Sequence, residues 1–539
     1  MISQLFLPIA ATLLAYVLFH AAQIVYRNLT SPLRHVVGPR SPSLILGNFK
    51  EMADDPALAE KWREEFGPNF LFRGLFSMSE LHTSDLKALN HIVTNSSIYQ
   101  KAEYNRKNTT RLVGKGILGV ESDEHRRHRR ILNPAFGVAQ IRNITEIFVE
   151  KATQLRDIWA HEVAKQGGEG HVDALSWLRR MTLDVIGQAG FNYQFDSLAT
   201  KEKPNEMTQV FTELFHSPYS RTYATFRLTQ SIAPILKLIP MPGWRILRAA
   251  HGKMYAIGCQ IVSKSKANIL AADGEKTLGN RRDLLSVLLR ANISTGLAEN
   301  QRLSEAEVIA QIPTFFLAGH ETTSSATAWA LHALSLNTAV QTTLREELMT
   351  LGTDNPTMDE LNSLPYLEKV VRETMRAYSP VVFTQRMATA DDVLPLSKPY
   401  IDKEGNEHYS LPIPKGQMIH IPIWGVNTSK EIWGEDAREF RPERWEHVPE
   451  AVSAVPGMWA NLFTFFAGPH NCIGFRFSLV ELKALLFMLI RAFEVHPAVP
   501  KGSIVPVTAG LLQRPAVLAE MGKGSGLPLI LKAVNTEAF

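Results

Sequence analysis

A lone cysteine set between two glycines constrains this chain more than any other feature. The ten residues from Phe465 to Gly474 hold Cys472 and run directly into an apolar-periodic helix pattern, Phe477 to Phe493. Gly468 and Gly474 remove side chains where the backbone turns sharply or lies close to a flat, bulky group. A helix N-terminus beside the sulfur favours thiolate over thiol. The stretch predicts a metal-binding thiolate at the mouth of a helix. The alternative is a small, buried cysteine with no chemistry.

Length and composition favour one large intracellular domain. The chain has 539 residues, 45% of them hydrophobic, which is ample for a large core. No Gly/Ser-rich or Pro-rich linker follows Asn48, and no internal repeat occurs. The formal charge of +4 is too small to argue for a nucleic-acid partner. Only Cys259 and Cys472 occur, so there is no disulfide framework, and the body belongs in a reducing compartment.

The N-terminus reads as a membrane anchor. Residues Met1 to Tyr26 carry no charged side chain and contain about 20 residues of mainly apolar sequence, enough to cross a bilayer as a helix. A cleaved signal peptide is the alternative, but the apolar run is long and no basic segment precedes it. Arg27, Arg34 and Arg40 follow, which places the body on the cytosolic side. Residues 27–48 form a proline-rich connector.

The body alternates long helical patterns with short extended ones. Strand-like segments occur at Phe70–Phe72, at Ile419–Ile423 and across Tyr400–Leu411, the last with a turn at Asp402–Gly405. Most of the remainder has helical periodicity. We therefore expect a mostly α fold with a small β region.

One predicted helix is long enough to pass through the centre of the domain. Ser304 and Glu307 form a capping-box pattern, and the apolar periodicity that follows continues to Ala333. That is a helix of roughly 30 residues, which is unusual for a surface helix.

The middle of this helix contains residues of the types that a reaction with a bound ligand would need. Ala318 and Gly319 are small enough for a planar cofactor or diatomic ligand to approach the backbone. Thr322 could then bond a bound oxygen species, with Glu321 linking it to solvent protons. The alternative is a glycine kink stabilised by a threonine that bonds the preceding turn of its own helix.

Two other segments carry charged or ionisable side chains one helical turn apart. His125 and Arg129 share one helix face within a dense basic run and suit the carboxylates of a buried planar ligand, although a solvated basic face is the commoner outcome. Glu373 and Arg376 lie three residues apart inside a helix from Pro365 to Tyr378. With Arg444 they would form a buried network that fixes the cysteine loop.

These segments, in this order and spacing, resemble the cytochrome P450 family of haem-thiolate monooxygenases, from the N-terminal anchor to about Pro515. The style is that of a fungal, basidiomycete enzyme of the endoplasmic reticulum. The resemblance implies an anchor over residues 1–26, a connector over 27–48 and a single large P450-like domain over 49–539. It also implies a cytosolic catalytic domain on a single-pass membrane protein.

The resemblance assigns roles residue by residue. Cys472 corresponds to the axial ligand of haem b iron, and Thr322 with Glu321 to the pair that assists dioxygen protonation. The propionate-binding positions correspond to His125, Arg129, Arg386 and His470, and the structural triad to Glu373, Arg376 and Arg444. His470 stands where the family usually has arginine, so pairing there is expected to be weaker or pH-sensitive. Ala318 stands where some relatives have a haem-esterifying glutamate, so the haem is expected to be non-covalent.

The implied reaction is hydroxylation of a lipophilic substrate with O2. Electrons would come from a separate NADPH-cytochrome P450 reductase, with cytochrome b5 as a helper, steered by a basic face of Arg126, Arg127, Arg130, Arg476 and Lys483.

The expected pocket residues are apolar: Phe315, Phe316, Ala318, Val381, Val382, Phe383 and Leu511, with the loop near Leu112–Leu118. A terpenoid, including triterpenoids and sterols, is the first expectation for the substrate of this secondary metabolism, and fatty acids or aromatic xenobiotics are the second. A haem-thiolate isomerase or dehydratase, and a membrane-anchored haem carrier or sensor, are the rival interpretations.

Overall fold

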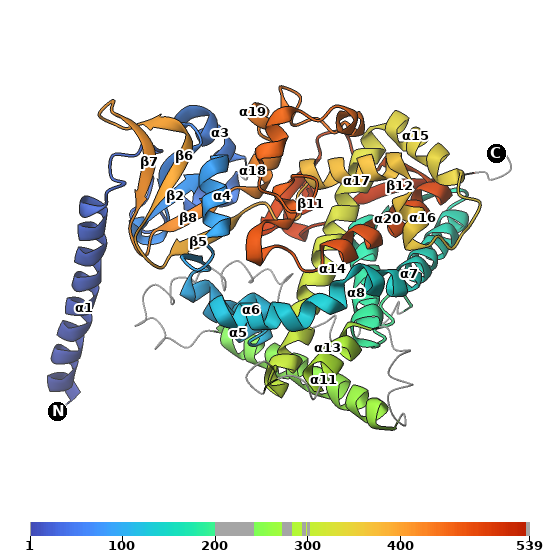
Figure 1. The fold of residues 1–539 in the computed structure, drawn as a ribbon, viewed down its shortest axis with the longest axis horizontal. Coiled ribbons are helices and arrows are strands. Elements are labelled where there is room, and N and C mark those ends of the chain that lie inside the picture. The colour runs from blue at the N-terminus through green and yellow to red at the C-terminus, as the bar shows by residue number, and fades with distance from the viewer. Residues whose placement is uncertain are drawn as a thin grey trace. The chain divides into compact units, whose positions relative to one another are not determined.

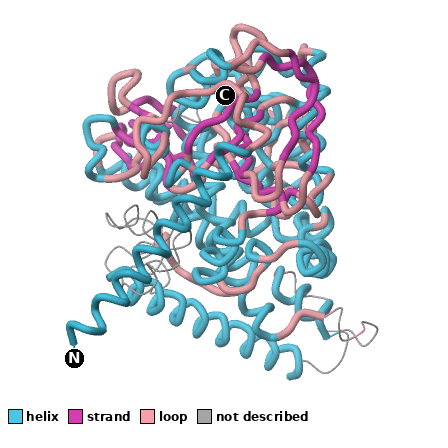
Figure 2. Tube along the Cα trace, turned by 90° about the vertical axis from the view of Figure 1, so that its left-hand side faces the viewer, coloured by secondary structure: helices cyan, strands magenta, loops and turns pink. Residues whose placement is uncertain are grey.

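The computed structural model describes residues 2–55, 57–199, 242–271, 283–293, 298 and 302–534. The chain divides into two compact units. The smaller unit holds Met1–Ala102 and Phe383–Gly425, and the larger holds Glu103–Val382 and Val426–Phe539. Helices dominate and the strands form small sheets, as Figure 2 shows, so the predicted mostly α fold with a small β region is confirmed.

The smaller unit is built on a five-stranded sheet of order β1-β2-β8-β5-β3, in which β2 and β8 run parallel. Its strands are β1 (Asn69–Arg73), β2 (Ser79–Thr83), β3 (Tyr99–Gln100), β5 (Thr384–Ala388) and β8 (Met418–Ile421). A separate hairpin pairs β6 (Asp392–Ile401) with β7 (Glu407–Ile413). The helices of this unit are α1 (Ile2–Thr30), α2 (Phe49–Asp54), α3 (Leu58–Phe66) and α4 (Leu86–Thr94), and α18 (Ile423–Asn427) crosses the boundary between the units.

Local sequence explains these elements. Trp62 of α3 packs on Phe70 and Phe72, two aromatic residues of β1 that are almost fully buried. The hairpin turn predicted at 402–405 is present. It is stabilised by the Asp402 carboxylate, which accepts the Glu404 N–H at 2.8 Å. Gly405 has a φ of +87°, which a glycine adopts without strain.

Helix α1 occupies the region expected to anchor the chain. It covers 29 residues and exposes large apolar side chains, among them Leu14, Leu18 and Phe19. The side chains of residues 2–10 lie outside the described set. Among the residues that the structure describes, no helix combines the length and the apolar character needed to cross a membrane.

The larger unit is mainly helical. Its helices are α5 (Glu103–Val113), α6 (Ser122–Leu132), α7 (Val138–Lys165), α8 (Ala174–Phe191), α11 (Pro242–Ala271), α13 (Leu284–Ile293), α14 (Glu305–Leu336), α15 (Thr338–Met349), α16 (Met358–Asn362), α17 (Pro365–Ala377), α19 (Lys430–Trp433) and α20 (Phe475–Ala492). A three-stranded sheet has the order β4-β12-β9, and β10 pairs with β11 as a hairpin. These strands are β4 (Glu169–Asp173), β9 (Phe493–Pro497), β10 (Ile504–Ala509), β11 (Leu512–Val517) and β12 (Pro528–Ala533).

Helix α14 is the axis of the larger unit, and the expectation of a central helix of about 30 residues is confirmed. It contacts α8, α11, α17, α20 and the strand β11 along its length (Figure 1). Ser304 and Glu307 form the expected capping box: the Ser304 hydroxyl accepts the Glu307 N–H, and the Glu307 carboxylate accepts the Ser304 N–H. Most side chains from Val308 to Ser335 are buried, so the position of each group on this helix is set by packing on several sides.

Candidate active site

The loop that carries Cys472 consists of two short 3-10 turns and ends at α20. The turns are η8 (Phe463–Phe465) and η9 (Gly468–His470). The Cys472 N–H donates to the Phe465 carbonyl at 2.9 Å, which folds the loop back on itself. Gly468 has a φ of +63°, so a glycine is favoured there. Gly474 has a φ of −90°, and a Cβ there would meet only Phe136 at 3.8 Å. The chain itself therefore does not require glycine at 474.

The Cys472 sulfur is free and exposed, and its neighbour Phe465 is buried. Burial among protein atoms raises the pKa of the Cys472 thiol, while the Gly474 N–H and the Arg129 charge oppose that shift. The residue is exposed because one side of the sulfur borders open space, and the pKa rises because protein atoms surround its other sides. The N–H at the start of α20 acts in the expected direction, towards the thiolate, but burial outweighs it for the free thiol. A cation bound at the sulfur would reverse the preference.

Three predicted cofactor-binding side chains meet beside this loop. Arg129 of α6 donates from both terminal nitrogens to Asn471, at 2.8 Å to the carbonyl and 2.6 Å to the side-chain oxygen. The His125 and His470 rings lie 4.1 Å apart, centre to centre. His470 also pairs with the buried Glu121 carboxylate at 3.0 Å. Sequence reasoning missed Asn471 and Glu121, since neither type of side chain stands out in its segment.

Arg386, the fourth predicted propionate ligand, belongs to the smaller unit. It lies on β5 and donates to the Thr384 hydroxyl at 2.9 Å and to the Gln385 carbonyl at 2.8 Å. Its predicted role stays a prediction.

The donor set at Cys472 fits a haem. One free sulfur is the ligand that a haem-thiolate iron needs, and no second cysteine lies near it in the sequence. Arg129 supplies a fixed cationic fork of the kind that binds carboxylates. His125 and His470 supply two imidazoles on the same side of the loop. These are the groups that a planar cofactor with one metal and two carboxylates would use.

Helix α14 shows the contact expected from the alternative interpretation of its central motif. The Thr322 hydroxyl donates to the Ala318 carbonyl of its own helix at 2.7 Å. A Cβ at Gly319 would meet Ile186 Cγ1 of α8 at 2.9 Å. Gly319 therefore lets α8 pack closely on α14. This packing is enough to account for a glycine at position 319, and its predicted role in admitting a ligand stays a prediction.

Glu321 is held in a buried ionic cluster. Its carboxylate lies 2.8 Å from Arg514 Nη2 on β11, and 3.5 Å from Arg179 Nε on α8. His320 Nε2 lies 3.4 Å from the same carboxylate, which is only 2% exposed. Burial lowers the pKa of Arg179, and the Glu321 charge acts against that shift. Arg179 and Arg514 could not be found from sequence, because each is more than a hundred residues from Glu321.

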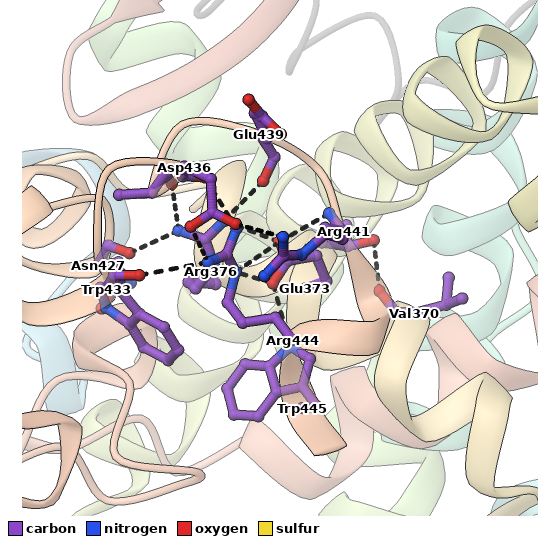
Figure 3. A network of polar contacts seen from close by, with 12 residues as sticks. Val370, Glu373, Arg376, Asn427, Trp433, Asp436, Glu439, Arg441, Arg444 and Trp445 are labelled. Carbon is purple, nitrogen blue, oxygen red and sulfur yellow. Dashed lines mark hydrogen bonds and ion pairs between the residues drawn. The ribbon is translucent and has the colours of Figure 1, made fainter. Parts of the chain in front are cut away.

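Glu373 is the centre of a second buried network, shown in Figure 3. Arg376 binds it through two nitrogens, at 2.8 and 2.9 Å, and Arg444 Nε lies 3.4 Å away. The Trp445 indole N–H and the Arg441 backbone N–H also donate to this carboxylate, at 3.1 and 2.9 Å. The predicted triad residues are therefore in contact, and their influence on the cysteine loop stays a prediction.

The network continues away from Glu373 along the backbone. Arg376 donates to the carbonyls of Asn427, at 3.1 Å, and Glu439, at 2.9 Å. The Asn427 side chain accepts the Phe463 N–H at 2.8 Å. Since Phe463 begins the first turn of the cysteine loop, a chain of hydrogen bonds links Arg376 to that loop.

The predicted pocket residues fall into three groups. Phe315 lies seven residues, about two turns, before Thr322 and so shares its helix face. Phe316 is fully buried against Phe191 and Phe195, at ring distances of 4.8 and 5.0 Å, which is a core position.

The second group joins the end of α17 to the β10–β11 hairpin. Val381 forms a bridge with Leu512, and the Val382 N–H donates to the Leu511 carbonyl at 3.2 Å. The Leu511 side chain is 45% exposed. The remaining candidate, Phe383, belongs to the smaller unit, where it stacks on His420 at 4.7 Å.

A cavity of about 350 Å³ lies beside the first half of α14. Its lining includes Ile309 and Pro313 of α14, Met254 of α11 and Gly114. Pro313 is nine residues, about two and a half turns, from Thr322 and so lies on the opposite helix face. This cavity is therefore separate from the predicted reaction site.

The predicted basic face is smaller than expected. Arg126, Arg130 and Arg476 are exposed. Arg127 pairs with Glu307, and Lys483 is buried and pairs with Glu368 at 2.7 Å. The last two are therefore engaged within the protein.

Comparison with known proteins decides the family. The family model described as cytochrome P450 matches residues 37–517. The chain belongs to the cytochrome P450 family. Cytochrome P450 monooxygenase 128 of Postia placenta is 49% identical to it over 97% of this chain and 96% of its own length. Monooxygenase 205 of the same fungus is 48% identical over 97% of each chain. A ganoderic acid synthetase of Ganoderma lucidum is 34% identical over 86% of this chain and 88% of its own length.

This P450 is therefore an oxidoreductase of the monooxygenase class. P450 enzymes hold haem iron through a cysteine thiolate and use O2, redox partners and lipophilic substrates. Cys472 is the cysteine that lies in a glycine-flanked loop at a helix start, with Arg129, His125 and His470 beside it. The family and the geometry agree on the same sulfur.

Proposed function

We propose that this P450 hydroxylates a terpenoid, triterpenoids and sterols included, in fungal secondary metabolism. The observation that carries the proposal is the free Cys472 sulfur with cationic donors on one side and apolar residues on the neighbouring elements. Phe315, Val381 and Leu511 offer no paired charge for a polar substrate. The name of one relative, ganoderic acid synthetase, supports a role in secondary metabolism.

In this proposal Cys472 holds the iron of a non-covalent haem b. Arg129, His125 and His470 would bind its propionates. When bound, the haem-thiolate group supplies the activation of O2 and the transfer of one oxygen atom to a C–H bond. The protein supplies orientation and exclusion of water. Glu121 already pairs with His470 at 3.0 Å, so this imidazole has a partner within the chain before any propionate is bound.

Glu321 and Thr322 handle protons. With a haem bound, the Thr322 hydroxyl would give up its bond to the Ala318 carbonyl and donate to O2. Glu321 would take up a proton from solvent and pass it to Thr322, while Arg514 and Arg179 hold its carboxyl group in place. This role of Glu321 differs from a freely exposed proton donor, since its charge is balanced by two guanidinium groups.

We also propose that residues 1–26 anchor the enzyme in the endoplasmic reticulum membrane with the catalytic domain in the cytosol. The uncharged N-terminal sequence and the arginines after it support this. Electrons then come from an NADPH-cytochrome P450 reductase, with cytochrome b5 as helper, docking at Arg126, Arg130 and Arg476. Carbonate extraction of membranes expressing residues 1–539 and 27–539 tests the anchor. Release of both forms into the supernatant would contradict it.

The substrate class is tested in microsomes that contain this P450 and a reductase. They are supplied with NADPH and a panel of terpenoids, sterols, fatty acids and aromatic compounds. We expect NADPH-dependent hydroxylation among the terpenoids or sterols, and none with Cys472→Ala. Turnover confined to fatty acids or aromatic compounds would contradict the proposed substrate class, and turnover without NADPH would contradict the monooxygenase reaction.

A further inference from the structure

A buried carboxyl that the proposed mechanism does not use lies on α20. Glu481 follows Cys472 by nine residues on the helix that the cysteine loop opens. It is 0% exposed, and among the residues that the structure describes neither carboxyl oxygen has a hydrogen-bond partner. The nearest lysine in sequence, Lys483, is engaged with Glu368 at 2.7 Å and with Asn362 at 2.8 Å.

The facing group on α14 is equally unusual. Helix α14 contains four threonines, and three of them donate to the carbonyl four residues earlier in their own helix. These are Thr314 at 2.8 Å, Thr322 at 2.7 Å and Thr327 at 2.9 Å. The fourth, Thr323, is 2% exposed, and its hydroxyl oxygen has no hydrogen-bond partner in the described part of the chain. The Thr323 hydroxyl is thus turned away from the bond that its neighbours make.

Helices α14 and α20 pack against each other, and the Glu481 and Thr323 side chains are both buried in the larger unit. Burial raises the pKa of Glu481 well above its ordinary value, and the Thr323 hydroxyl opposes that shift. An ionised carboxylate buried without a partner is costly, so the neutral acid is the stable form. A neutral acid has one O–H to donate, and a threonine hydroxyl can accept it. Each group can satisfy the other.

We propose that Glu481, as a neutral carboxylic acid, bonds the Thr323 hydroxyl and so positions the Glu321–Thr322 segment of α14 over the helix that follows Cys472. Glu481 is a positioning residue, since it acts through Thr323. The proposal rests on the proposed function of Glu321 and Thr322.

The physical consequence concerns the bend of α14. Without Glu481, the Thr323 hydroxyl is free to bond the Gly319 carbonyl, four residues earlier. Such back-bonding bends helices. Gly319 also packs on Ile186, so a bend there would be felt at the α8 contact. The Thr322 hydroxyl would then move relative to the reacting oxygen, and small displacements of that kind uncouple proton delivery.

Three variants of the full-length holoenzyme test the proposal. Glu481→Gln keeps a buried donor, Glu481→Met keeps volume without a donor, and Thr323→Val removes the hydroxyl at nearly constant shape. Hydrogen peroxide released per NADPH consumed is measured with reductase, which needs no identified substrate. We expect Glu481→Gln to stay within about twofold of the unmodified enzyme, and Glu481→Met and Thr323→Val each to release at least about fivefold more peroxide. The double variant Glu481→Met/Thr323→Val should be no worse than either single variant.

Infrared difference spectra of Glu481→Gln against the unmodified protein give a second readout that is independent of turnover. We expect the loss of a protonated-carboxyl C=O band that is present up to pH 8. A carboxylate band in its place would overturn the proposal, as would additive effects in the double variant or unchanged peroxide release in Thr323→Val. If Glu481→Met fails to bind haem, Thr323→Val and the infrared band decide the matter. Failure of the proposed function shows differently, as a missing thiolate spectrum in the unmodified protein.

Discussion

Two buried carboxyls of the larger unit, Glu373 and Glu481, are both 0% exposed but have opposite surroundings. Glu373 accepts hydrogen bonds from two guanidinium groups, an indole and a backbone N–H. Within the described residues, neither oxygen of Glu481 accepts a hydrogen bond of ordinary geometry, and the Thr323 hydroxyl is its polar neighbour. Glu373 is surrounded by cationic and N–H donors, whereas burial without such donors raises the pKa of Glu481. Burial alone therefore does not determine the role of a carboxyl group. The groups that contact it determine that role.

Removing the paired anion should have the largest effect. Glu373→Ala leaves Arg376 buried without its carboxylate and leaves Arg444 with Asp436 alone, which costs about 3–5 kcal/mol. We expect loss of folded, haem-containing protein, and the same for Arg376→Ala. Haem content per purified chain and the free energy of unfolding measure it.

The matched control is Arg372→Ala on the same helix. Arg372 pairs with Glu368 at 2.7 Å, and its side chain is 37% exposed, so its loss should cost less than about 1 kcal/mol. Equal haem content in Glu373→Ala and Arg372→Ala would show that the buried network is not what holds the cysteine loop.

A carboxyl of the smaller unit whose hydrogen-bond donor is a neutral amide, Glu80, should show the opposite sign. Burial raises the pKa of Glu80 to about 7, and the Gln385 amide opposes this only partly. A carboxyl whose pKa is higher in the folded state loses its stabilising contribution as pH rises from about 4.5 through 7. Glu80→Gln should therefore be more stable than the unmodified protein at pH 8, by at most about 3 kcal/mol, with the difference vanishing near pH 4.

Urea unfolding at pH 4, 6 and 8 measures this difference. The control is Glu65→Gln, which changes an exposed carboxyl on α3. A Glu80→Gln variant that is less stable at pH 8 than at pH 4, relative to the unmodified protein, would contradict the assigned direction.

Glu321 lies between these extremes. Arg514→Met removes its nearer guanidinium, at 2.8 Å, but leaves Arg179 at 3.5 Å, so we expect a loss of about 1–2 kcal/mol in unfolding free energy. Arg514→Lys keeps the charge and should recover most of the loss. If both variants lose the same amount, packing at position 514 matters and the ion pair does not.

Thr322→Ala should have the smallest effect on stability and a clear effect on coupling. The hydroxyl bonds only its own helix, so stability should change by less than about 1 kcal/mol. Haem and the carbon monoxide spectrum should be retained, while reducing equivalents go to hydrogen peroxide. Thr327→Ala removes a similarly back-bonded hydroxyl one turn further on and should leave coupling unchanged. Full coupling in Thr322→Ala would show that this hydroxyl does not deliver protons.

The features predictable from sequence were those written within a few residues. The capping box at Ser304, the break after α17 before Pro380 and the turn at Asp402–Gly405 depend on neighbours in the chain, and all are present. The contacts that determine the behaviour of Glu321 were not predictable, because α8, α14 and β11 bring Arg179 and Arg514 to it from distant segments.

Residue type alone does not separate packing from ligand binding. Gly319, predicted to open the backbone to a ligand, accommodates Ile186 of α8. Phe316, predicted to line a pocket, packs on Phe191 and Phe195, and both roles stay predictions. Small and aromatic residues on a buried helix serve packing and ligands equally well. Only the neighbouring elements distinguish the two uses.

The central claim is that the Cys472 sulfur is the ligand of the haem iron. Its most direct test is the reduced carbon monoxide spectrum of Cys472→Ser, reconstituted with haem. We predict that the red-shifted Soret band typical of thiolate ligation is present in the unmodified protein and absent in this variant. An unchanged red-shifted band in Cys472→Ser would contradict the account.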